Sequence, residues 1–185
     1  MKENYEIGEV CHRNDVVGLM VLGLIAFQHE YYAGALFPNK REKHGSLGYV
    51  LGEKSIKSAH YLNMVRAAFS TKRGTIVGFV CGLTQHLAKN IPYLEPLVQS
   101  FTTVQDYPLY ISLYVKPEYR RRGIATGLFE IIEWQAKKQL IKTLFLLTDK
   151  DSVPGKTFLE SYGFADTGLD LYPDRCVFMK LLQYD

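Results

Sequence analysis

The stretch PEYRRRGIATGLFE, residues 117–130, decides which fold the sequence predicts. Three arginines run into a glycine, and apolar residues at helical spacing follow at once over residues 122–139. The segment YPLYISLYV, residues 107–115, precedes this stretch and is rich in the β-branched and aromatic residues that favour strands. The sequence therefore predicts a strand, a short turn and a long helix in succession. The apolar positions expected along the helix are Ile124, Leu128, Ile131, Ile132 and Trp134.

The turn between this strand and this helix has the composition of an anion-binding site. A helix N-terminus presents unpaired N–H groups and carries about half a positive charge, a combination that favours phosphate or pyrophosphate. Gly123 and Ala125 leave room for a ligand to reach the backbone, and the arginines at 120–122 add full charges at the same point. A solvated basic turn is the other interpretation of such an arginine run. The small residues at the start of the helix favour the anion site.

The rest of the chain predicts one α/β domain. A length of 185 residues favours a single domain over residues 1–185, and no repeat or linker divides the sequence. Residues 86–106 form a connector that is expected to be partly helical. The order of the elements indicates a mixed sheet. The expected strands cover 5–11, 61–70, 75–85, 107–115, 143–148 and 176–182, and the expected helices follow Asn14, cover 122–139 and end at Gly163.

Composition and charge argue against several classes of protein. The formal net charge is only +3, because 19 acidic residues nearly offset 22 basic ones, and no nucleic-acid partner is expected. The distant cysteines Cys11, Cys81 and Cys176 include no CxxC pair and indicate free thiols in a reducing cytoplasm. The five histidines lack metal-ligand spacing, so no metal is expected. The apolar run at 16–27 has 12 residues, whereas a membrane span needs roughly 20, so a buried helix is expected there instead.

Two segments of the sequence resemble the GNAT N-acetyltransferase superfamily. Arg120, Gly123 and Ala125 fit the family's Gln/Arg-x-x-Gly-x-Gly/Ala signature, and the segment FLESYGF, residues 158–164, is similar to its aromatic-acidic-x-x-Gly-Phe segment. The resemblance covers about residues 107–165 and extends to the strand pair at 61–84. It implies an α/β fold whose mixed, mostly antiparallel central sheet is flanked by helices.

The resemblance also implies where acetyl-CoA would bind. The backbone of the strand at 113–115 would bond the pantetheine arm, and the N–H groups of residues 121–126 would hold the pyrophosphate. Ser152 stands where the family usually has an asparagine near the pantetheine, and Lys156 would reach a CoA phosphate. The implied cofactor-binding positions are Leu113, Tyr114, Val115, Arg120, Arg121, Arg122, Gly123, Ile124, Ala125, Thr126, Ser152 and Lys156.

The chemistry of acetyl transfer indicates which catalytic groups the chain needs. A base takes a proton from the amine, a donor stabilises the oxyanion and an acid protonates the leaving thiolate. The resemblance implies a backbone N–H near Val115 as the oxyanion donor and a tyrosine acid four residues before Gly163, where this chain has Leu159. Water, Ser152 or Tyr162 are the remaining proton sources, and a thiol with a pKa of about 8.5 leaves readily. The candidate bases are Asp106, Glu95, Tyr110 and Tyr114.

The function implied by the resemblance is cytoplasmic N-acetyl transfer from acetyl-CoA to a primary amine by direct attack on the thioester. A non-catalytic acyl-CoA-binding sensor or regulatory module of the same fold is the alternative, and the leucine at position 159 favours it. The acceptor is a small-molecule amine or a protein amine. The connector at 86–106 carries only Glu95 and Asp106 as acids, which favours a small or singly charged amine over a polycation. Many members of the family pair through their C-terminal strands, so a homodimer is compatible with the resemblance.

Overall fold

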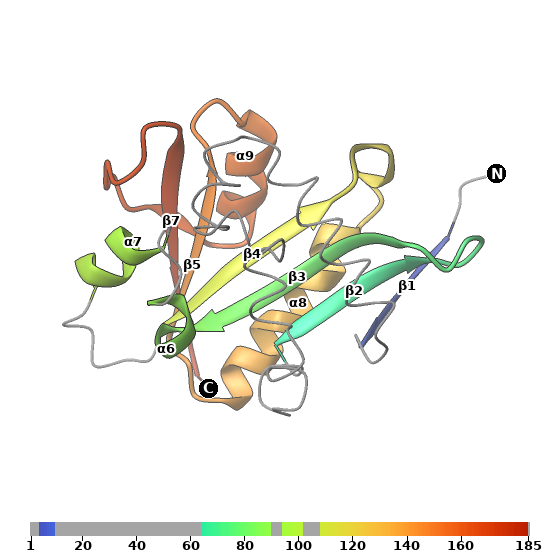
Figure 1. Cartoon of the computed structure of the whole chain (residues 1–185), viewed down its shortest axis with the longest axis horizontal. Coiled ribbons are helices and arrows are strands. Elements are labelled where there is room, and N and C mark those ends of the chain that lie inside the picture. The colour runs from blue at the N-terminus through green and yellow to red at the C-terminus, as the bar shows by residue number, and fades with distance from the viewer. Residues whose placement is uncertain (1–3, 10–63, 90–93, 102–107, 185) are drawn as a thin grey trace, which may run out of the picture. The chain divides into compact units, whose positions relative to one another are not determined.

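The fold is given by a computed structural model that describes residues 4–9, 64–89, 94–101 and 108–184 (Figure 1). These residues form two compact units, which are described separately. Unit 1 comprises the described residues of Met1–Cys81 and Leu113–Gln135, and unit 2 those of Gly82–Asn90, Leu94–Ser112 and Ala136–Asp185. The single domain expected over residues 1–185 stays a prediction.

The described residues contain a mixed α/β architecture, as the sequence predicted. Seven strands follow the order β1-β2-β3-β4-β5-β7-β6, in which β4 and β5 are parallel and β1–β2, β2–β3, β5–β7 and β6–β7 are antiparallel. The strands are β1 Tyr5–Glu9, β2 Val65–Ser70, β3 Ile76–Thr84, β4 Leu109–Val115, β5 Thr143–Asp149, β6 Ala165–Asp166 and β7 Arg175–Leu181. The helices are α6 Gln85–Ala88, α7 Glu95–Ser100, the 3-10 helix η1 Pro117–Tyr119, α8 Ile124–Lys138 and α9 Val153–Ser161.

In unit 1, β2 and β3 form the hairpin that the sequence predicted around the turn TKRG. Gly74 has a φ of 62°, a left-handed conformation that favours glycine, and its N–H donates to the carbonyl of Ser70 at 2.7 Å. The edge strand β1 pairs with β2 over five residues, from Tyr5 opposite Ser70 to Glu9 opposite Arg66. Asn4, directly before β1, is held as well, because the N–H and the hydroxyl of Thr71 both donate to its carbonyl at 3.1 Å.

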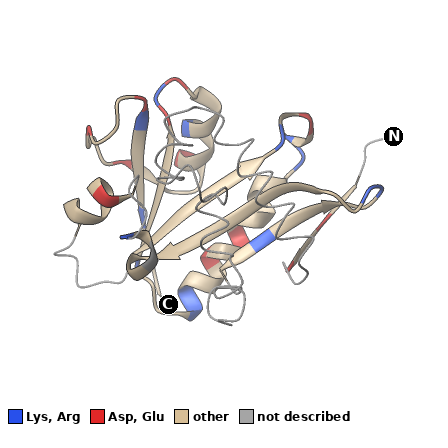
Figure 2. Cartoon of the chain, in the orientation of Figure 1, with Lys and Arg blue, Asp and Glu red and all other residues tan. Residues whose placement is uncertain are grey.

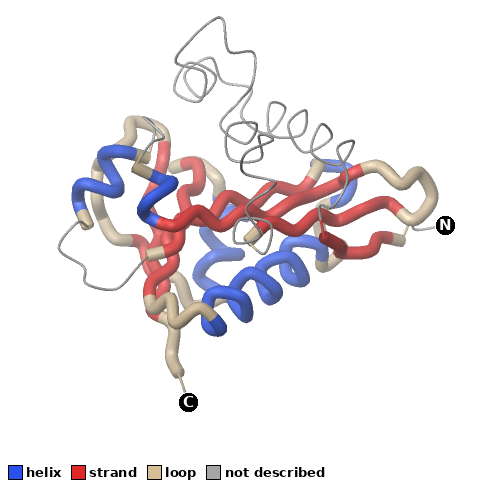
Figure 3. The backbone as a smooth tube through the Cα atoms, turned by 60° about the horizontal axis from the view of Figure 1, so that its bottom comes forward, coloured by secondary structure: helices blue, strands red, loops and turns tan. Residues whose placement is uncertain are grey.

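Helix α8 packs against one face of the strands of unit 1 (Figure 3). The register aligns Ile7, Ala68 and Gly78 across β1, β2 and β3, so their side chains share one face of the sheet. A Cβ on Gly78 would lie 3.2 Å from a methyl group of Ile124, and a Cβ on Gly127 would lie 2.7 Å from a methyl group of Ile7. Small residues on both sides therefore allow the helix and the strands to approach closely.

The buried face of α8 includes only some of the apolar positions named in the sequence analysis. Ile124, Leu128 and Ile132 are buried as expected, whereas Ile131 is half-buried and Trp134 is 52% exposed. The reason is helical geometry, because two residues turn a helix by about 200° and place Trp134 opposite Ile132. The helix expected around Trp134 is confirmed, but this apolar side chain lies on the exposed side of it.

In unit 2, β5 pairs with β4 on one side and with β7 on the other. Leu109, Tyr110 and Ile111 pair with Leu144, Phe145 and Leu146 in parallel, and β5 pairs with β7 along its whole length. An aromatic cluster lies on these strands: the Phe145 ring stacks on Tyr110 at 5.6 Å and contacts Phe101 at 4.4 Å between ring centroids. Tyr110 and Phe145 belong to the buried core of the unit, and Phe101 is half-buried beside them.

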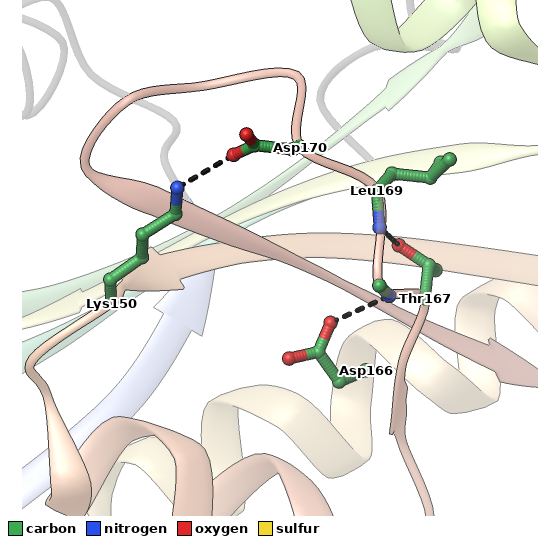
Figure 4. Close-up of polar contacts among 6 residues, drawn as sticks. Lys150, Asp166, Thr167, Leu169 and Asp170 are labelled. Atoms are coloured by element: carbon green, nitrogen blue, oxygen red, sulfur yellow. Dashed lines mark hydrogen bonds and ion pairs between the residues drawn. The ribbon is translucent and has the colours of Figure 1, made fainter.

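The loop between β6 and β7 is tied down by polar contacts (Figure 4). Lys150 and Asp170 form an ion pair at 2.7 Å, and a carboxylate oxygen of Asp166 accepts the N–H of Gly168 at 2.9 Å. The ion pair raises the pKa of Lys150 and lowers that of Asp170 through the same hydrogen bond. Both partners are exposed, so this ion pair fixes loop geometry and adds little stability.

Most of the predicted strands and helices agree with the structure, and the main exception is the short β6, which the sequence analysis did not anticipate. The partly helical connector is confirmed by α6 and α7. The helix expected after Asn14, the apolar run at 16–27 and Cys11 lie outside the described residues. None of the helices in the described segments has the length and apolar character needed to span a membrane.

Candidate functional site

The turn between β4 and α8 has a backbone suited to anion binding. After η1, Arg120 is extended, and then Arg121 and Gly123 have positive φ values of 57° and 83°. A left-handed conformation costs a residue with a Cβ about 1–2 kcal/mol, and such strain is concentrated at functional sites. Turns of this kind gather backbone N–H groups into concavities that bind anions. The backbone therefore fits the anion site that the sequence predicted.

The first turn of α8 supplies the N–H groups. The N–H of Gly127 donates to the carbonyl of Gly123 at 2.9 Å, one turn earlier. The N–H groups of Ile124, Ala125 and Thr126 precede this bond and belong to the part of a helix that has no intrahelical acceptor. Ala125 and Thr126 are half-buried and Gly123 is exposed. These N–H groups are thus placed to receive a pyrophosphate, because Gly123 and Ala125 carry little or no side chain and the larger Ile124 is buried.

Arg120 holds the turn against the end of β4. Its Nε donates to the carbonyl of Val115 at 3.0 Å, and its guanidinium lies 6.0 Å from the centre of the Tyr114 ring. The side chain therefore links the strand that would bond the pantetheine to the turn that would hold the pyrophosphate. The sequence analysis assigned Arg120 to the cofactor through its charge, and the hydrogen bond adds a positioning role.

The other two arginines keep the positive charge at the turn (Figure 2). The guanidinium of Arg122 donates to the carbonyl of Glu118 at 2.8 Å and lies 5.1 Å above the Tyr119 ring. Arg121 is exposed and lies on the left-handed residue of the turn. Arg122 is therefore oriented by its own neighbours, whereas the position of Arg121 is set by the backbone.

The end of β4 directs alternate backbone groups to opposite sides. The N–H of Lys116 donates to the carbonyl of Val77 on β3 at 2.9 Å. Because neighbouring residues of a strand point their backbone groups in opposite directions, the N–H and carbonyl of Val115 face away from β3. The hydrogen bond from Arg120 to the Val115 carbonyl agrees with this direction. The predicted oxyanion donor is therefore not used in pairing with β3.

In unit 2, Ser152 caps the N-terminus of α9. Its hydroxyl oxygen accepts the N–H of Gly155 at 3.2 Å, and Pro154 occupies the first turn. A Cβ on Gly155 would lie 2.8 Å from the Ser152 hydroxyl, so the glycine permits the close approach. The sequence analysis missed this capping role, although a serine followed by a proline at the start of a helix is its usual signal. Lys156 lies half-buried in the first turn of the same helix.

Comparison with known proteins identifies the family of the chain. The sequence model of the acetyltransferase (GNAT) family matches residues 29–164. The chain belongs to this family. A comparison with curated proteins found no match.

Solved structures of GNAT acetyltransferases share the fold. Arabidopsis thaliana Naa50 in complex with the bisubstrate analogue CoA-Ac-MVNAL is 16% identical, with a TM-score of 0.59 over 95% of this chain and 97% of that one. The PaiA N-acetyltransferase of Thermoplasma acidophilum in complex with coenzyme A is 17% identical, with a TM-score of 0.58 over 97% and 99%. An N-acetyltransferase from Staphylococcus aureus Mu50 is 15% identical, with a TM-score of 0.66 over 97% and 99%. The family supports acetyl transfer as the general activity, and these neighbours show the same fold.

This GNAT chain has no hydroxyl at the position of the expected acid. Leu159 is 2% exposed and packs into the core, as its apolar side chain requires. Tyr162 is the C-terminal cap of α9, half-buried, with its ring 4.9 Å from that of Phe158. Gly163 follows with a φ of 77°, and its N–H donates to the carbonyl of Glu160 at 2.9 Å. Tyr162 is the tyrosine nearest in sequence to the usual acid position.

The candidate bases differ in burial, in hydrogen bonding and in whether the structure describes them. Burial raises the pKa of Tyr110 to about 12, so its phenol stays protonated near neutral pH and is unsuited to act as a base. Glu95 is exposed and accepts a hydrogen bond from Gln99 at 3.0 Å. Tyr114 is half-buried beside Arg120, and Asp106 lies outside the described residues. The described segments contain no group of three His, Cys, Asp or Glu side chains that could hold a metal ion.

Proposed function

We propose that this GNAT protein transfers the acetyl group of acetyl-CoA to a primary amine. The observation that carries the proposal is the turn from Arg120 to Gly123, with its two left-handed residues at the N-terminus of α8. Coenzyme A is bound in the solved structure of PaiA, and a CoA-containing bisubstrate analogue in that of Naa50. The same fold in this chain supports the same cosubstrate.

The residues of the turn fit the pyrophosphate of acetyl-CoA. The N–H groups of Ile124, Ala125 and Thr126 would donate to its oxygens, and the arginines at 120–122 would neutralise its charge. Leu113, Tyr114 and Val115 would bond the pantetheine as an added strand. For Ser152 and Lys156, the family resemblance supports places near the pantetheine and a phosphate.

The reaction we propose is a direct displacement at the thioester. The amine nitrogen, after losing a proton to a base, forms a bond to the acetyl carbon while the carbon–sulfur bond breaks. The Val115 N–H would donate to the oxyanion, a contribution that can be worth about 10²–10³ in rate. Tyr162 or water would give a proton to the thiolate. Tyr114 and Asp106 are the proposed bases. Tyr110 is not proposed as a base, because its raised pKa keeps the phenol protonated.

The acceptor we favour is a small or singly charged amine. The described part of the connector, in α6 and α7, carries Glu95 as its acidic residue, and this carboxylate already bonds Gln99. A polycationic amine would need several carboxylates for its charges. A protein amine is the other acceptor class, since Naa50 is found with an analogue that joins CoA to the sequence MVNAL. We place the reaction in the cytoplasm, and a homodimer stays compatible with the family.

A non-catalytic acyl-CoA sensor is the second candidate function. The observation that favours it is the buried Leu159 at the usual acid position. A sensor would retain the turn and bind acetyl-CoA without releasing free thiol. Both candidates therefore require the same cosubstrate site and differ only in turnover.

The test combines acetyl-CoA binding by calorimetry with thiol release over a panel of amines on the same sample. The panel should include monoamines, polyamines and short peptides with free N-termini. Binding with turnover would support the transferase and identify the acceptor class. Binding with no turnover on any amine would favour the sensor, and no binding would overturn both functions.

A further inference from the structure

The hydroxyl of Tyr5 lies against the glycine of the anion-binding turn. A Cβ on Gly123 would lie 3.3 Å from Tyr5 Oη, and among the described residues this hydroxyl is the one group within 4 Å of that position. The two residues are far apart in sequence and are brought together because β1 and α8 pack face to face in unit 1. A phenol from the N-terminal strand therefore stands at the positive end of the helix.

The position of Tyr5 is fixed by its strand. Tyr5 pairs with Ser70, and Ile7 on the same face of β1 packs against Gly127. Gly123, directly before α8, and Gly127 are four residues apart and lie on one side of the helix, just as Tyr5 and Ile7 lie on one face of β1. These two contacts, one helical turn apart, position β1 against the N-terminus of α8 and place the Tyr5 hydroxyl beside the turn.

The hydroxyl of Tyr5 is available to a ligand. Within the described part of the chain it makes no hydrogen bond, although the ring is half-buried. A phenol donates one hydrogen bond through its O–H. Around it, the turn offers donors and positive charge: the N–H groups of the first helical turn and the arginines at 120–122. An anion is the partner that such a set of donors lacks.

We infer that Tyr5 is a further cosubstrate-binding residue, whose hydroxyl donates to a pyrophosphate oxygen of acetyl-CoA held at the turn. The inference rests on the proposed function, because it requires the turn to bind CoA. It adds the N-terminal strand β1 to the site, which the signature in residues 120–125 does not include. Tyr5 then acts on affinity for the cosubstrate and takes no part in the chemical step.

The experiment measures CoA binding by calorimetry for the full chain, for Tyr5→Phe and for Ile7→Val. Tyr5→Phe removes only the hydroxyl and should weaken CoA binding roughly tenfold, as expected for a hydrogen bond to a charged group. Ile7→Val loosens the contact of β1 with α8 without removing a donor, so CoA affinity should stay within about twofold of the parent protein. Melting temperatures of the three proteins report any change in folding.

Three outcomes would overturn the inference, and they are distinguishable. If the parent protein binds CoA and Tyr5→Phe binds it equally well, only the role of Tyr5 is wrong. If Ile7→Val weakens binding as much as Tyr5→Phe, the tyrosine acts through docking of the strand. If the parent protein fails to bind CoA, both the proposed function and the inference are wrong.

A second ligand tests which phosphate is bonded. Dephospho-CoA lacks the 3′-phosphate and keeps the pyrophosphate. The loss in Tyr5→Phe should be the same for CoA and for dephospho-CoA. A loss seen with CoA alone would overturn the pyrophosphate assignment, because the hydroxyl would then bond the 3′-phosphate.

Discussion

Replacing Gly123 with glutamate should abolish CoA binding at concentrations where the parent protein binds. The φ of 83° at Gly123 strains any residue with a Cβ by about 1–2 kcal/mol. The carboxylate adds repulsion: two unit charges 4 Å apart repel by about 1 kcal/mol in bulk water and about 4 kcal/mol at an effective dielectric constant of 20. With the two charges of a pyrophosphate, the lower figure already gives about 2 kcal/mol, or roughly a 30-fold loss of affinity.

The matched control is Gly74→Glu in the hairpin between β2 and β3. Gly74 has a φ of 62°, and no atom of the described segments lies within 4 Å of an added Cβ, so the variant carries the same kind of backbone strain and the same charge. Both variants should lose a few degrees in melting temperature, since 1 kcal/mol shifts the midpoint by about 2–4 °C for a protein of this size. Only Gly123→Glu should lose CoA binding in calorimetry. Equal CoA affinity in Gly123→Glu and the parent protein would refute the placement of the site.

Three further predictions test the positioning arginine, the acid and the buried thiol. Arg120→Ala should weaken CoA binding by about tenfold, with a smaller salt dependence of affinity, because it removes one charge and frees the Val115 carbonyl; an unchanged salt dependence measured by calorimetry would contradict this. Tyr162→Phe should lower kcat with little effect on KM if that hydroxyl protonates the thiolate, and an unaltered kcat in the thiol-release assay would remove it from the mechanism. Burial raises the pKa of Cys81 to about 12, so the stability that the neutral thiol provides is complete below about pH 9 and is lost as the pH rises toward 12. Cys81→Ala should reduce this alkaline loss in urea unfolding compared at about pH 8 and about pH 10.5, and an equal loss in both proteins would argue against it.

The strands and helices could be predicted from the sequence where the local residue pattern agrees with the packing of the whole fold. The hairpin of β2 and β3 has two apolar runs around a turn with a glycine, and α8 has apolar residues at helical spacing after an arginine–glycine turn. By contrast, β6 has two residues and exists because Ala165 and Asp166 pair with β7. A strand of that length carries no periodicity, so only the partner strand reveals it. Trp134 shows a different limit, since being apolar did not place it on the buried face.

The candidate site could be predicted from the sequence only where its residues are close together along the chain. The run from Arg120 to Thr126 forms one turn, so its charge, small residues and helix start could be interpreted together. The contact between Tyr5 and Gly123 joins residues that only the packing of β1 on α8 brings together. The hydrogen bond from Arg120 to the Val115 carbonyl could not be predicted from the sequence, because it depends on the conformation of the turn. The capping role of Ser152 could have been predicted from the proline that follows it.

The buried leucine at position 159 weighs less against catalysis than its place in the family pattern suggests. A general acid contributes about 10²–10⁴ in rate, whereas holding two reactants in register can supply effective concentrations of about 10⁵–10⁸ M. A thiolate also needs little help in leaving, since a thiol has a pKa of about 8.5. A turn that binds the pyrophosphate and a strand end that presents the Val115 N–H would thus retain most of the catalytic advantage without a tyrosine at Leu159. The leucine therefore affects the expected rate of transfer more than it affects the choice between a transferase and a sensor.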